Sequence, residues 1–255
     1  MSHHIKISAI ILTKNSERRL RECIESLIEI VDEIIVIDGY STDGTVSICN
    51  DYPKIRVFQK SFEGFAKERT YALGKVKGDW VIQIDSDEVI KEKCASELRR
   101  MILSDCYDAI KVWNKTFFAG KFLQSSDRTP AFKAFKIDYL YYNESQLVHE
   151  IPMVKSGARV GVANGLIIHY HDFDLKKTWR KFARYAALRF GMEKCLSARR
   201  ILTRPIAIFF VRLIRDLRII DGFHGLFLAS IEATACLFVG LKEFTKILNN
   251  ARFKY

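Results

Sequence analysis

The segment WVIQIDSDEVI, residues 80–90, joins an apolar run to a cluster of acids. Its first half is apolar apart from Gln83 and predicts a buried strand. Three acids follow at once: Asp85, Asp87 and Glu88. Carboxylates this close repel one another unless a cation lies among them. An exposed turn that caps a helix beginning near Lys91 is the alternative interpretation.

Strand-like and helix-like segments alternate through the first ninety residues. Apolar runs at 6–13, 32–38, 55–60 and 79–85 predict strands. Residues 17–30 and 65–73 predict helices, and STDGT opens another. Since the strands are rich in Ile and Val on both faces and helices separate them, we expect an α/β fold. Its sheet should be mostly parallel, with helices on both faces.

The polar residues of this half follow the predicted strands. They are Thr13-Lys14-Asn15, Asp38-Gly39 and Asp85-Ser86-Asp87. Parallel sheets bind ligands beyond the carboxyl ends of their strands, so these residues should share one site. Two acids with one residue between them, on a rigid strand end, suit a divalent cation. Mg²⁺ or Mn²⁺ there would bridge phosphate oxygens, which favours a metal site over a turn.

The pattern changes after the first hundred residues. From about residue 105, aromatic-rich segments predict strands of mixed orientation, with loops at QSSDRTP and NESQLVHE. From Asp174 the chain is predicted to be helical. We therefore expect a catalytic domain at 1–173, divided into a nucleotide-binding half (1–104) and an acceptor half (105–173). Residues 174–255 would form a basic amphipathic helical region.

Charge and cysteine usage bound the compartment and the partners. Residues 1–173 hold 24 Lys and Arg against 24 Asp and Glu, whereas residues 174–255 hold 17 against 6. The basic third points to a polyanionic partner. The six cysteines form no CxxC pair, which favours reduced thiols in the cytosol. MSHHIKISAIILT enters a strand-like run almost at once, so we expect no signal peptide.

The last two helical segments are apolar but interrupted by charge. Arg212 breaks the first and Glu232 lies in the middle of the second, so neither makes a convincing transmembrane span. We expect helices that lie at a membrane interface. A buried helical hairpin packed on the sheet is the alternative. Long aliphatic stretches between the charges favour lipid over nucleic acid.

Four segments carry a resemblance to a known family. They are ISAIILTKN (7–15), DEIIVIDGYSTDGT (32–45), GFAKERTYAL (64–73) and GDWVIQIDSDE (78–88). In this order the chain resembles bacterial family 2 glycosyltransferases, which have the GT-A (Rossmann-like) fold. LVHE (147–150), the IIHYHD segment and the DGFHG turn (221–225) extend the likeness to lipopolysaccharide inner-core β-glucosyltransferases.

The resemblance implies roles for particular residues. A UDP-sugar would lie against Thr13, Asn15, Glu17, Asp38, Lys67, Arg69, Asp85 and Ser86. Asp85 and Asp87 would be the metal-binding DxD pair, with Asp87 the direct ligand. His169 shares a strand face with His171 and suits a metal or phosphate contact, although a half-buried strand with polar tips would look the same.

The resemblance also implies an inverting enzyme with a general base for the acceptor hydroxyl. Glu150 of LVHE is our choice for that base, and Asp127 is its rival. Family members commonly show an Arg-Leu-Phe-like triplet in the preceding strand. Here Lys133 stands in KAFK (133–136), or Arg128 serves from the loop, and lysine lacks the bidentate geometry of arginine.

These observations together predict a cytoplasmic, metal-dependent glycosyltransferase bound peripherally to the inner face of the membrane. The expected donor is UDP-glucose, and the expected acceptor is a lipid-linked core oligosaccharide of lipopolysaccharide or lipooligosaccharide. A nucleotidyltransferase with a related sheet remains an alternative, although TKNSERRL lacks the glycines of a phosphate loop. A non-enzymatic membrane- or RNA-binding protein would leave the acids unexplained. An oligomer is compatible with the helical region.

Overall fold

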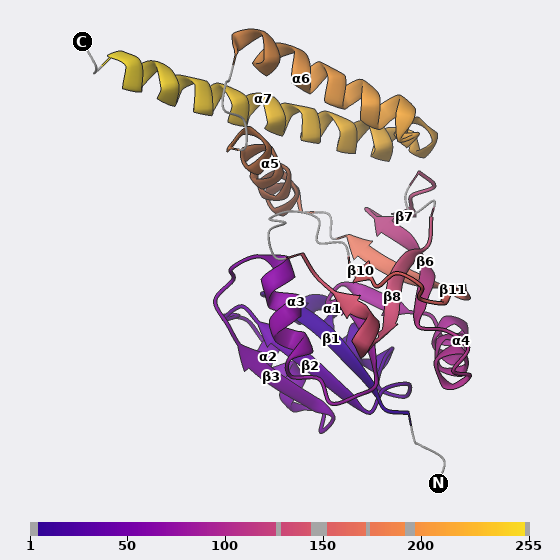
Figure 1. Cartoon of the computed structure of the whole chain (residues 1–255). Helices are drawn as coiled ribbons and strands as arrows, with labels where there is room; N and C mark the ends of the chain where they lie inside the picture. Colours follow the sequence, from indigo (N-terminus) through magenta and orange to yellow (C-terminus); the bar gives the residue numbers. More distant parts are fainter. Residues whose placement is uncertain (1–4, 126–128, 144–151, 172–173, 192–196, 253–255) are drawn as a thin grey trace. The chain divides into compact units, whose positions relative to one another are not determined.

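The computed structural model of the 255-residue chain describes residues 5–125, 129–143, 152–171, 174–191 and 197–252 (Figure 1). The chain forms two compact units. The first contains Met1–Thr116 and Asp127–Tyr170, and the second contains Phe117–Ser126 and His171–Tyr255. The functional boundary that we predicted at residues 173 and 174 stays a prediction.

The first unit is built on one large sheet with the strand order β3-β2-β1-β4-β8-β6-β11-β5. The strands are β1 (Ile7–Thr13), β2 (Glu33–Asp38), β3 (Ile55–Gln59), β4 (Trp80–Asp85), β5 (Glu88–Ile90), β6 (Ala109–Phe118), β8 (Ala131–Lys136) and β11 (Val160–His171). Strands β3, β2, β1 and β4 are parallel to one another. Strand β8 runs antiparallel to β4 and β6, and β5 runs antiparallel to β11. The predicted α/β fold is confirmed, including the change of strand orientation after residue 105.

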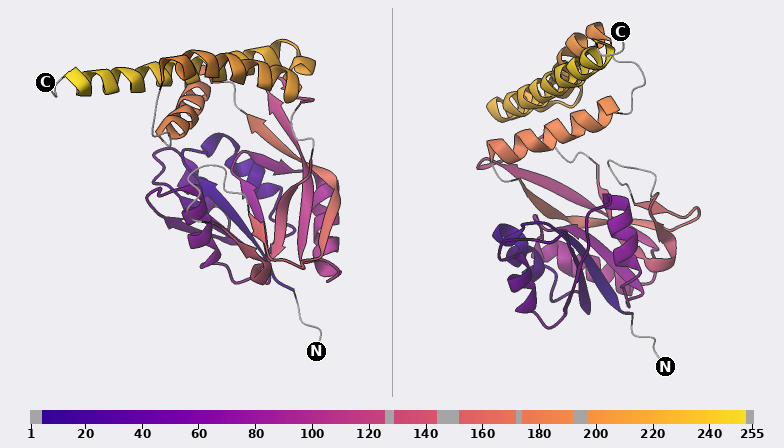
Figure 2. Two further views of the ribbon diagram at one scale, coloured as in Figure 1. Left: turned by 45° about the horizontal axis from the view of Figure 1, so that its top comes forward. Right: turned by 90° about the vertical axis from the view of Figure 1, so that its left-hand side faces the viewer.

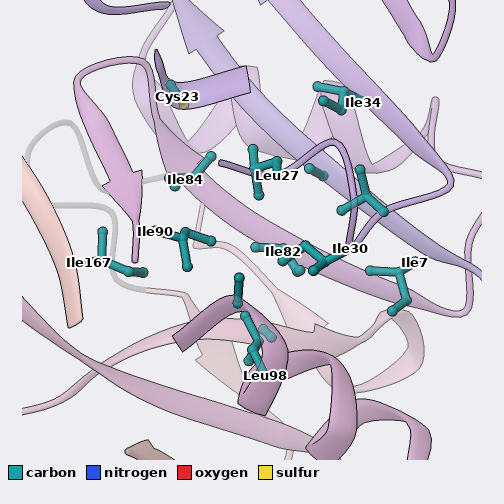
Figure 3. Packing of buried hydrophobic residues seen from close by; sticks show 14 of the residues in the cluster. Ile7, Cys23, Leu27, Ile30, Ile34, Ile82, Ile84, Ile90, Leu98 and Ile167 are labelled. Atoms are coloured by element: carbon teal, nitrogen blue, oxygen red, sulfur yellow. The ribbon is translucent and has the colours of Figure 1, made fainter. Parts of the chain in front are cut away.

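Helices cover both faces of the parallel half. Alternate residues of β1 face opposite ways, because side chains alternate along a strand. Ile11 belongs to the cluster that includes residues of α1 (Glu17–Glu25), α2 (Thr45–Asn50) and α4 (Glu92–Leu103). Ile10 packs with Ala72 of α3 (Phe65–Leu73). The first cluster reaches β5 and β11 through Ile90 and Ile167, as Figure 3 shows.

Helix α1 is shorter than the predicted 17–30. It ends at Glu25, and the chain continues in turns to Ile30. The Ser26 hydroxyl donates to the Cys23 carbonyl at 2.7 Å and accepts from the Ile90 amide at 3.1 Å. Leu27 and Ile30 are nevertheless buried, so the apolar pattern reports the core correctly and overestimates the helix.

The acids after β4 do not cap a helix. The short strand β5 separates Asp85 and Asp87 from α4, whose N-cap residue is Lys91. The side chain of Lys91 makes no capping hydrogen bond. The capping interpretation of residues 85–88 is therefore wrong, and another reason is needed for the acids.

The second unit is mainly helical. Its elements are β7 (Lys121–Phe122), α5 (Leu175–Gly191), α6 (Ala198–Phe210), the π-helical turn η2 (Val211–Arg215), η3 (Arg218–Asp221) and α7 (Phe223–Arg252). Helix α7 packs on α5 and α6, and α6 and α7 lie side by side in every view (Figure 2). Ala186 of α5 and Cys236 and Val239 of α7 form its buried cluster.

Within the second unit, the two charges that interrupt the apolar segments meet. Glu232 of α7 is buried, and Arg212 donates to it through Nε at 3.0 Å and Nη2 at 2.8 Å. Residues Phe223–Lys246 of α7 are long and apolar enough to cross a membrane, with a mean hydropathy of 1.6, and 44% of their most apolar stretch is buried. Helices α6 and α7 thus form a hairpin within the second unit, and the expected position of these helices at a membrane interface stays a prediction.

Candidate active site

The predicted site residues Thr13, Asp38 and Asp85 end three adjacent strands. Thr13 of β1 is in register with Asp38 of β2, and Leu12 is in register with Asp85 of β4. Both pairings are parallel, so the three carboxyl ends meet at one edge of the sheet. This is the edge at which parallel α/β sheets bind ligands.

Asp38 is fully buried and holds the loop that follows it. Its carboxylate accepts from the Thr13 hydroxyl at 3.1 Å, the Ser41 amide at 2.9 Å and Gln59 Nε2 at 3.3 Å. The Ser41 hydroxyl also donates to it. Burial disfavours ionisation, but the hydrogen bonds from Ser41, Gln59 and Thr13 outweigh it, and the pKa of Asp38 lies below its usual value. Asp38 is thus an ionised anchor, and its predicted contact with the UDP-sugar stays a prediction.

Asn15 and Glu17 join the loop after β1 to the loop after β2. Asn15 has a positive φ of 52°; its amide donates to the Ser41 hydroxyl at 2.8 Å, and its Oδ1 accepts from the Thr42 amide at 2.8 Å. Glu17 Oε2 accepts from the Gly44 amide at 2.6 Å. These polar side chains fix both loops, and that arrangement leaves Tyr40 about half exposed.

Arg69 of α3 meets Asp85 at the end of β4. Its Nη2 lies 2.6 Å from Asp85 Oδ1; the Arg69 side chain is 4% exposed and that of Asp85 is 46% exposed. Burial opposes ionisation of Asp85, but Arg69, Lys133 and His169 together lower its pKa to about 2. Asp85 is therefore a carboxylate at neutral pH, with one oxygen held from inside the protein.

A buried polar row supports Arg69. Gln83 of β4 lies between the Tyr142 hydroxyl and the Arg69 guanidinium. With the amide oxygen turned towards Arg69, this oxygen accepts from Nε at 3.1 Å and the amide NH₂ faces Tyr142. Gln83 interrupts an otherwise apolar strand in the sequence, and this interruption is the signal from which its role could have been predicted.

A second buried pair lies beside the first. Lys133 of β8 and Glu88 of β5 are 9% and 3% exposed, and their Nζ and Oε2 atoms are 2.5 Å apart. Glu88 Oε2 also accepts from the amide of Asp85 at 3.0 Å. Lys133 is thus used inside the protein as the partner of Glu88, rather than offered to a phosphate. Arg128, the other candidate for that role, lies outside the described residues.

Asp87 and His169 face each other across β5 and β11. His169 is in register with Glu88, and its Nε2 lies 3.3 Å from Asp87 Oδ2. The backbone carbonyl of Asp87 accepts from the Tyr170 amide at 2.8 Å. Burial lowers the pKa of His169, but the hydrogen bond and charge of Asp87, with Glu88 and Asp85, raise it above its usual value. The strand thus brings His169 to the acid pair.

The remaining predicted residues differ in position. Ser86 donates to the hydroxyl of Ser16, at the start of α1, at 2.9 Å. Lys67 is half exposed and lies 3.4 Å from Glu63 Oε2. Asp127 and Glu150, the two candidates for the base, lie outside the described residues.

The chemistry of the acid pair suits a hard divalent cation. Among the described residues, no three His, Cys, Asp or Glu side chains already form a metal cage. Mg²⁺ does not require one, because it is commonly held by one or two carboxylates together with substrate phosphates and water. Asp87 and the solvent-facing side of Asp85 supply such carboxylates, while His169 contacts Asp87 and its predicted role as a metal ligand stays a prediction. The residues present therefore fit the ion that the sequence predicts.

Comparison with known families gives this site its context. The profile described as Glycosyl transferase family 2 matches residues 8–160, well over half of the chain. The chain belongs to glycosyltransferase family 2. The family assignment confirms the resemblance carried by the four N-terminal segments, and the matched range includes every strand end described above.

Individual relatives differ in how much they share with this family 2 chain. An uncharacterized glycosyltransferase of Rickettsia felis is 36% identical over 103 residues, which are 40% of this chain and 36% of that protein. The chain thus matches little more than a third of the length of that relative. The lipopolysaccharide core biosynthesis glycosyltransferase LpsC of Rhizobium meliloti is 28% identical over 82% of this chain and 80% of its own.

A solved structure shares the fold of this family 2 chain. The crystal structure of S. aureus TarS 1-349 in complex with UDP-GlcNAc has a TM-score of 0.53 and 16% sequence identity, and covers 95% of this chain and 92% of its own. This likeness confirms the expected GT-A fold.

Proposed function

We propose that this protein is a metal-dependent, inverting glycosyltransferase that moves a hexose to a lipid-linked core oligosaccharide. The expected hexose is glucose, and the expected donor is UDP-glucose. The observation that carries the proposal is the acid pair, Asp85 and Asp87, at the edge where three parallel strands end. The name of LpsC supports an acceptor of the lipopolysaccharide core class. The UDP-GlcNAc complex of TarS supports a UDP-sugar donor on this fold.

The proposed reaction is a single displacement. The acceptor oxygen attacks the anomeric carbon, the bond from that carbon to the diphosphate oxygen breaks, and UDP leaves with the bonding electrons. A general base takes the acceptor proton, an effect that is typically worth ~10²–10⁴ in rate. Glu150 is the proposed base and Asp127 the alternative. No covalent intermediate is required, so no activated nucleophile is expected.

The chain's own residues have separate tasks in this proposal. Asp87, Asp85 and His169 would hold Mg²⁺ or Mn²⁺, and the ion would neutralise charge that develops on the leaving diphosphate. Arg69 fixes the orientation of Asp85 from the interior. The joined loops of Asn15 and Glu17 would line the nucleotide, because they lie beside the same strand ends.

We also propose that the protein works in the cytoplasm, bound peripherally to the inner face of the membrane. A lipid-linked acceptor is reached from such a surface. The basic composition of residues 174–255 supports an anionic leaflet as the partner. Nucleic acid is not expected to bind.

Calorimetric titration of UDP tests the donor site. We expect wild-type protein to bind UDP with Mn²⁺ and to lose most of that affinity in EDTA. Asp87→Ala should behave with Mn²⁺ as wild type does in EDTA. Asp51→Ala is the matched control, because Asp51 is an exposed acid that pairs with Arg21 on the surface. Metal-independent binding, or full binding by Asp87→Ala, would remove the metal-site argument.

The identity of the products separates the enzyme classes. A glycosyltransferase given UDP-glucose and acceptor releases UDP, whereas a nucleotidyltransferase given a nucleoside triphosphate and a sugar phosphate releases pyrophosphate. Release of pyrophosphate alone would favour the second class. A panel of UDP-sugars then identifies the hexose.

A further inference from the structure

The outer side of α6 and of the turn that follows it is apolar. Four large apolar residues follow one another at intervals of four, and each is more than half exposed: Leu202 (60%), Ile206 (60%), Phe210 (52%) and Ile214 (59%). Residues four apart lie on the same side of a helix, so they form a line along it. Large apolar side chains are normally exposed singly, and a continuous set marks a surface that contacts something else.

The turn into α7 adds two more exposed apolar residues. Ile219 is 57% exposed, and Phe223, the first residue of α7, is 77% exposed. Leu217 and Gly222 have positive φ values of 56° and 61°, which allow the chain to reverse direction sharply here. We call the set the α6 face; it consists of Leu202, Ile206, Phe210, Ile214, Ile219 and Phe223.

The acids of this region are turned inwards. Between residues 198 and 240 the sequence has three acids, Asp216, Asp221 and Glu232. Glu232 accepts from Arg212 at 2.8 Å and from Arg218 at 3.3 Å. The other two are also held within the second unit: Asp216 lies 2.7 Å from Arg212, and Asp221 accepts from the backbone amides of Gln124 and Ser125 at 2.5 and 3.1 Å.

Basic residues border the α6 face. Arg199 and Arg200 are exposed in the first turn of α6. Arg215 follows Ile214 and is 75% exposed, and it also contacts Asp216 at 3.2 Å. The outward surface is thus apolar with positive charge at its margins, and of the three acids only Asp216, with a side chain that is 28% exposed, is partly open to solvent.

We propose that the α6 face inserts into the interfacial region of an anionic lipid bilayer, with Arg199, Arg200 and Arg215 among the lipid phosphates. Apolar side chains with basic neighbours are what such an interface accommodates. A second copy of the chain fits less well, because a two-fold contact would bring the same positive margins together. A membrane-spanning α7 fits less well too, because it would carry Glu232 and its arginine partners towards the bilayer centre.

This inference deepens the membrane part of the proposed function, but its test does not depend on sugar transfer. Full-length protein is mixed with vesicles of phosphatidylcholine alone or with 30% phosphatidylglycerol, and the bound fraction is measured by sedimentation. We expect at least ~10-fold tighter binding to the anionic vesicles, and weakening at high salt. Equal binding to both vesicle types would overturn the role of charge and with it the proposal.

Variants locate the surface. Ile206→Glu and Phe210→Glu should each weaken binding ~10-fold or more, because each removes an inserted apolar group and adds a repelled charge. Arg199→Gln and Arg215→Gln should each weaken it by about fivefold, the factor that corresponds to roughly 1 kcal/mol per basic residue. Leu103→Glu is the matched control, since Leu103 is 44% exposed on α4 of the first unit.

Thermal unfolding, UDP titration and the association state in solution keep the outcomes distinct. Thermal unfolding shows that each variant is folded, and UDP titration shows that its donor site is intact, so a failed donor site and a failed membrane surface are told apart. Wild-type vesicle binding by Phe210→Glu would overturn the proposal. So would a concentration-dependent dimer in solution that Phe210→Glu abolishes, because the face would then belong to a second copy.

Discussion

Arg69 holds one oxygen of Asp85 at 2.6 Å from inside the first unit, while the Asp85 side chain remains 46% exposed. A buried guanidinium without a charged partner would be costly, and so would an acid cluster without a cation. The pairing removes part of both costs before any ligand binds. The acids at the end of β4 are therefore partly compensated by the protein itself, and the metal proposed here would complete that compensation.

Replacing Arg69 tests whether this compensation serves the donor site. Arg69→Met should weaken UDP binding in Mn²⁺ by about tenfold or more, because Asp85 loses the group that orients it. Arg69→Lys should recover only part of the affinity, since lysine supplies charge without the planar geometry of arginine. Calorimetry measures both, with Arg21→Met as the control on the surface pair with Asp51. Wild-type affinity in Arg69→Met would assign the pair to folding alone.

The Tyr142 hydroxyl offers a finer test of the buried row. Tyr142→Phe removes its bond to Gln83 and should lower the free energy of unfolding by about 1 kcal/mol. Because Gln83 then holds Arg69 less firmly, the KM for the donor should also rise several-fold. Tyr141→Phe is a matched control, because Tyr141 is the neighbouring residue and is 42% exposed. In a Gln83→Leu background the effect of Tyr142→Phe on KM should disappear. An undiminished effect would contradict the proposal that Tyr142 acts on Arg69 through Gln83.

Asp108 gives a prediction about pH that is independent of the site. Arg159 donates to it at 2.8 and 2.9 Å, Lys136 lies 3.1 Å away, and these contacts outweigh burial and hold its pKa well below the usual value. A depressed folded-state pKa contributes stability above the unfolded value of about 3.9, and the contribution is lost as the pH falls through the folded value. Asp108→Asn should therefore cost about 1–3 kcal/mol in the free energy of unfolding at pH 7.

Denaturant unfolding at several pH values measures this effect. The difference between wild type and Asp108→Asn should shrink steadily as the pH falls below about 4. Asp105→Asn serves as the comparison, because Asp105 contacts Lys136 but its side chain is 69% exposed. This substitution should therefore lower the free energy of unfolding by less. A difference that does not change with pH would show that the pairing of Asp108 is unimportant.

Much of the fold was accessible from the sequence because its signals are local. The Ile and Val runs of β1, β2 and β4 predict buried strands, and parallel pairing then brings Thr13, Asp38 and Asp85 to one edge. The early end of α1 was not accessible, since it depends on Ser26 bonding to the distant Ile90 amide.

The partner of Glu88 was likewise inaccessible from the sequence, because Lys133 lies on a strand that is distant in the chain. His169 was a candidate metal contact from the sequence, but its direct contact with Asp87 depends on the antiparallel register of β11 and β5. The pairing of charges in the hairpin of the second unit was also inaccessible from the sequence. Arg212 and Glu232 each looked like an interruption of an apolar segment, and only their pairing shows that one neutralises the other.

The Arg212–Glu232 pair predicts an asymmetry between two arginines of the same turn. Arg212→Met should destabilise the protein by about 3–5 kcal/mol, because Glu232 would remain buried with less charge compensation. Arg215→Met should cost less than about 1 kcal/mol, since that side chain is 75% exposed. Chemical unfolding followed by circular dichroism compares them. Equal losses in the free energy of unfolding would mean that Glu232 becomes solvated or protonated when Arg212 is replaced.

The choice between Glu150 and Asp127 is the prediction closest to the chemistry. Glu150→Gln keeps the size of the side chain and removes its ability to take a proton, so UDP affinity should be unchanged. Transfer to the acceptor should fall by ~10²–10⁴. Asp127→Asn, made and measured in parallel, should retain transfer within about tenfold of wild type. If the two variants exchange these phenotypes, Asp127 is the base. If both retain transfer while Asp87→Ala is inactive, the donor site is correct and the proton goes to a group that neither segment supplies.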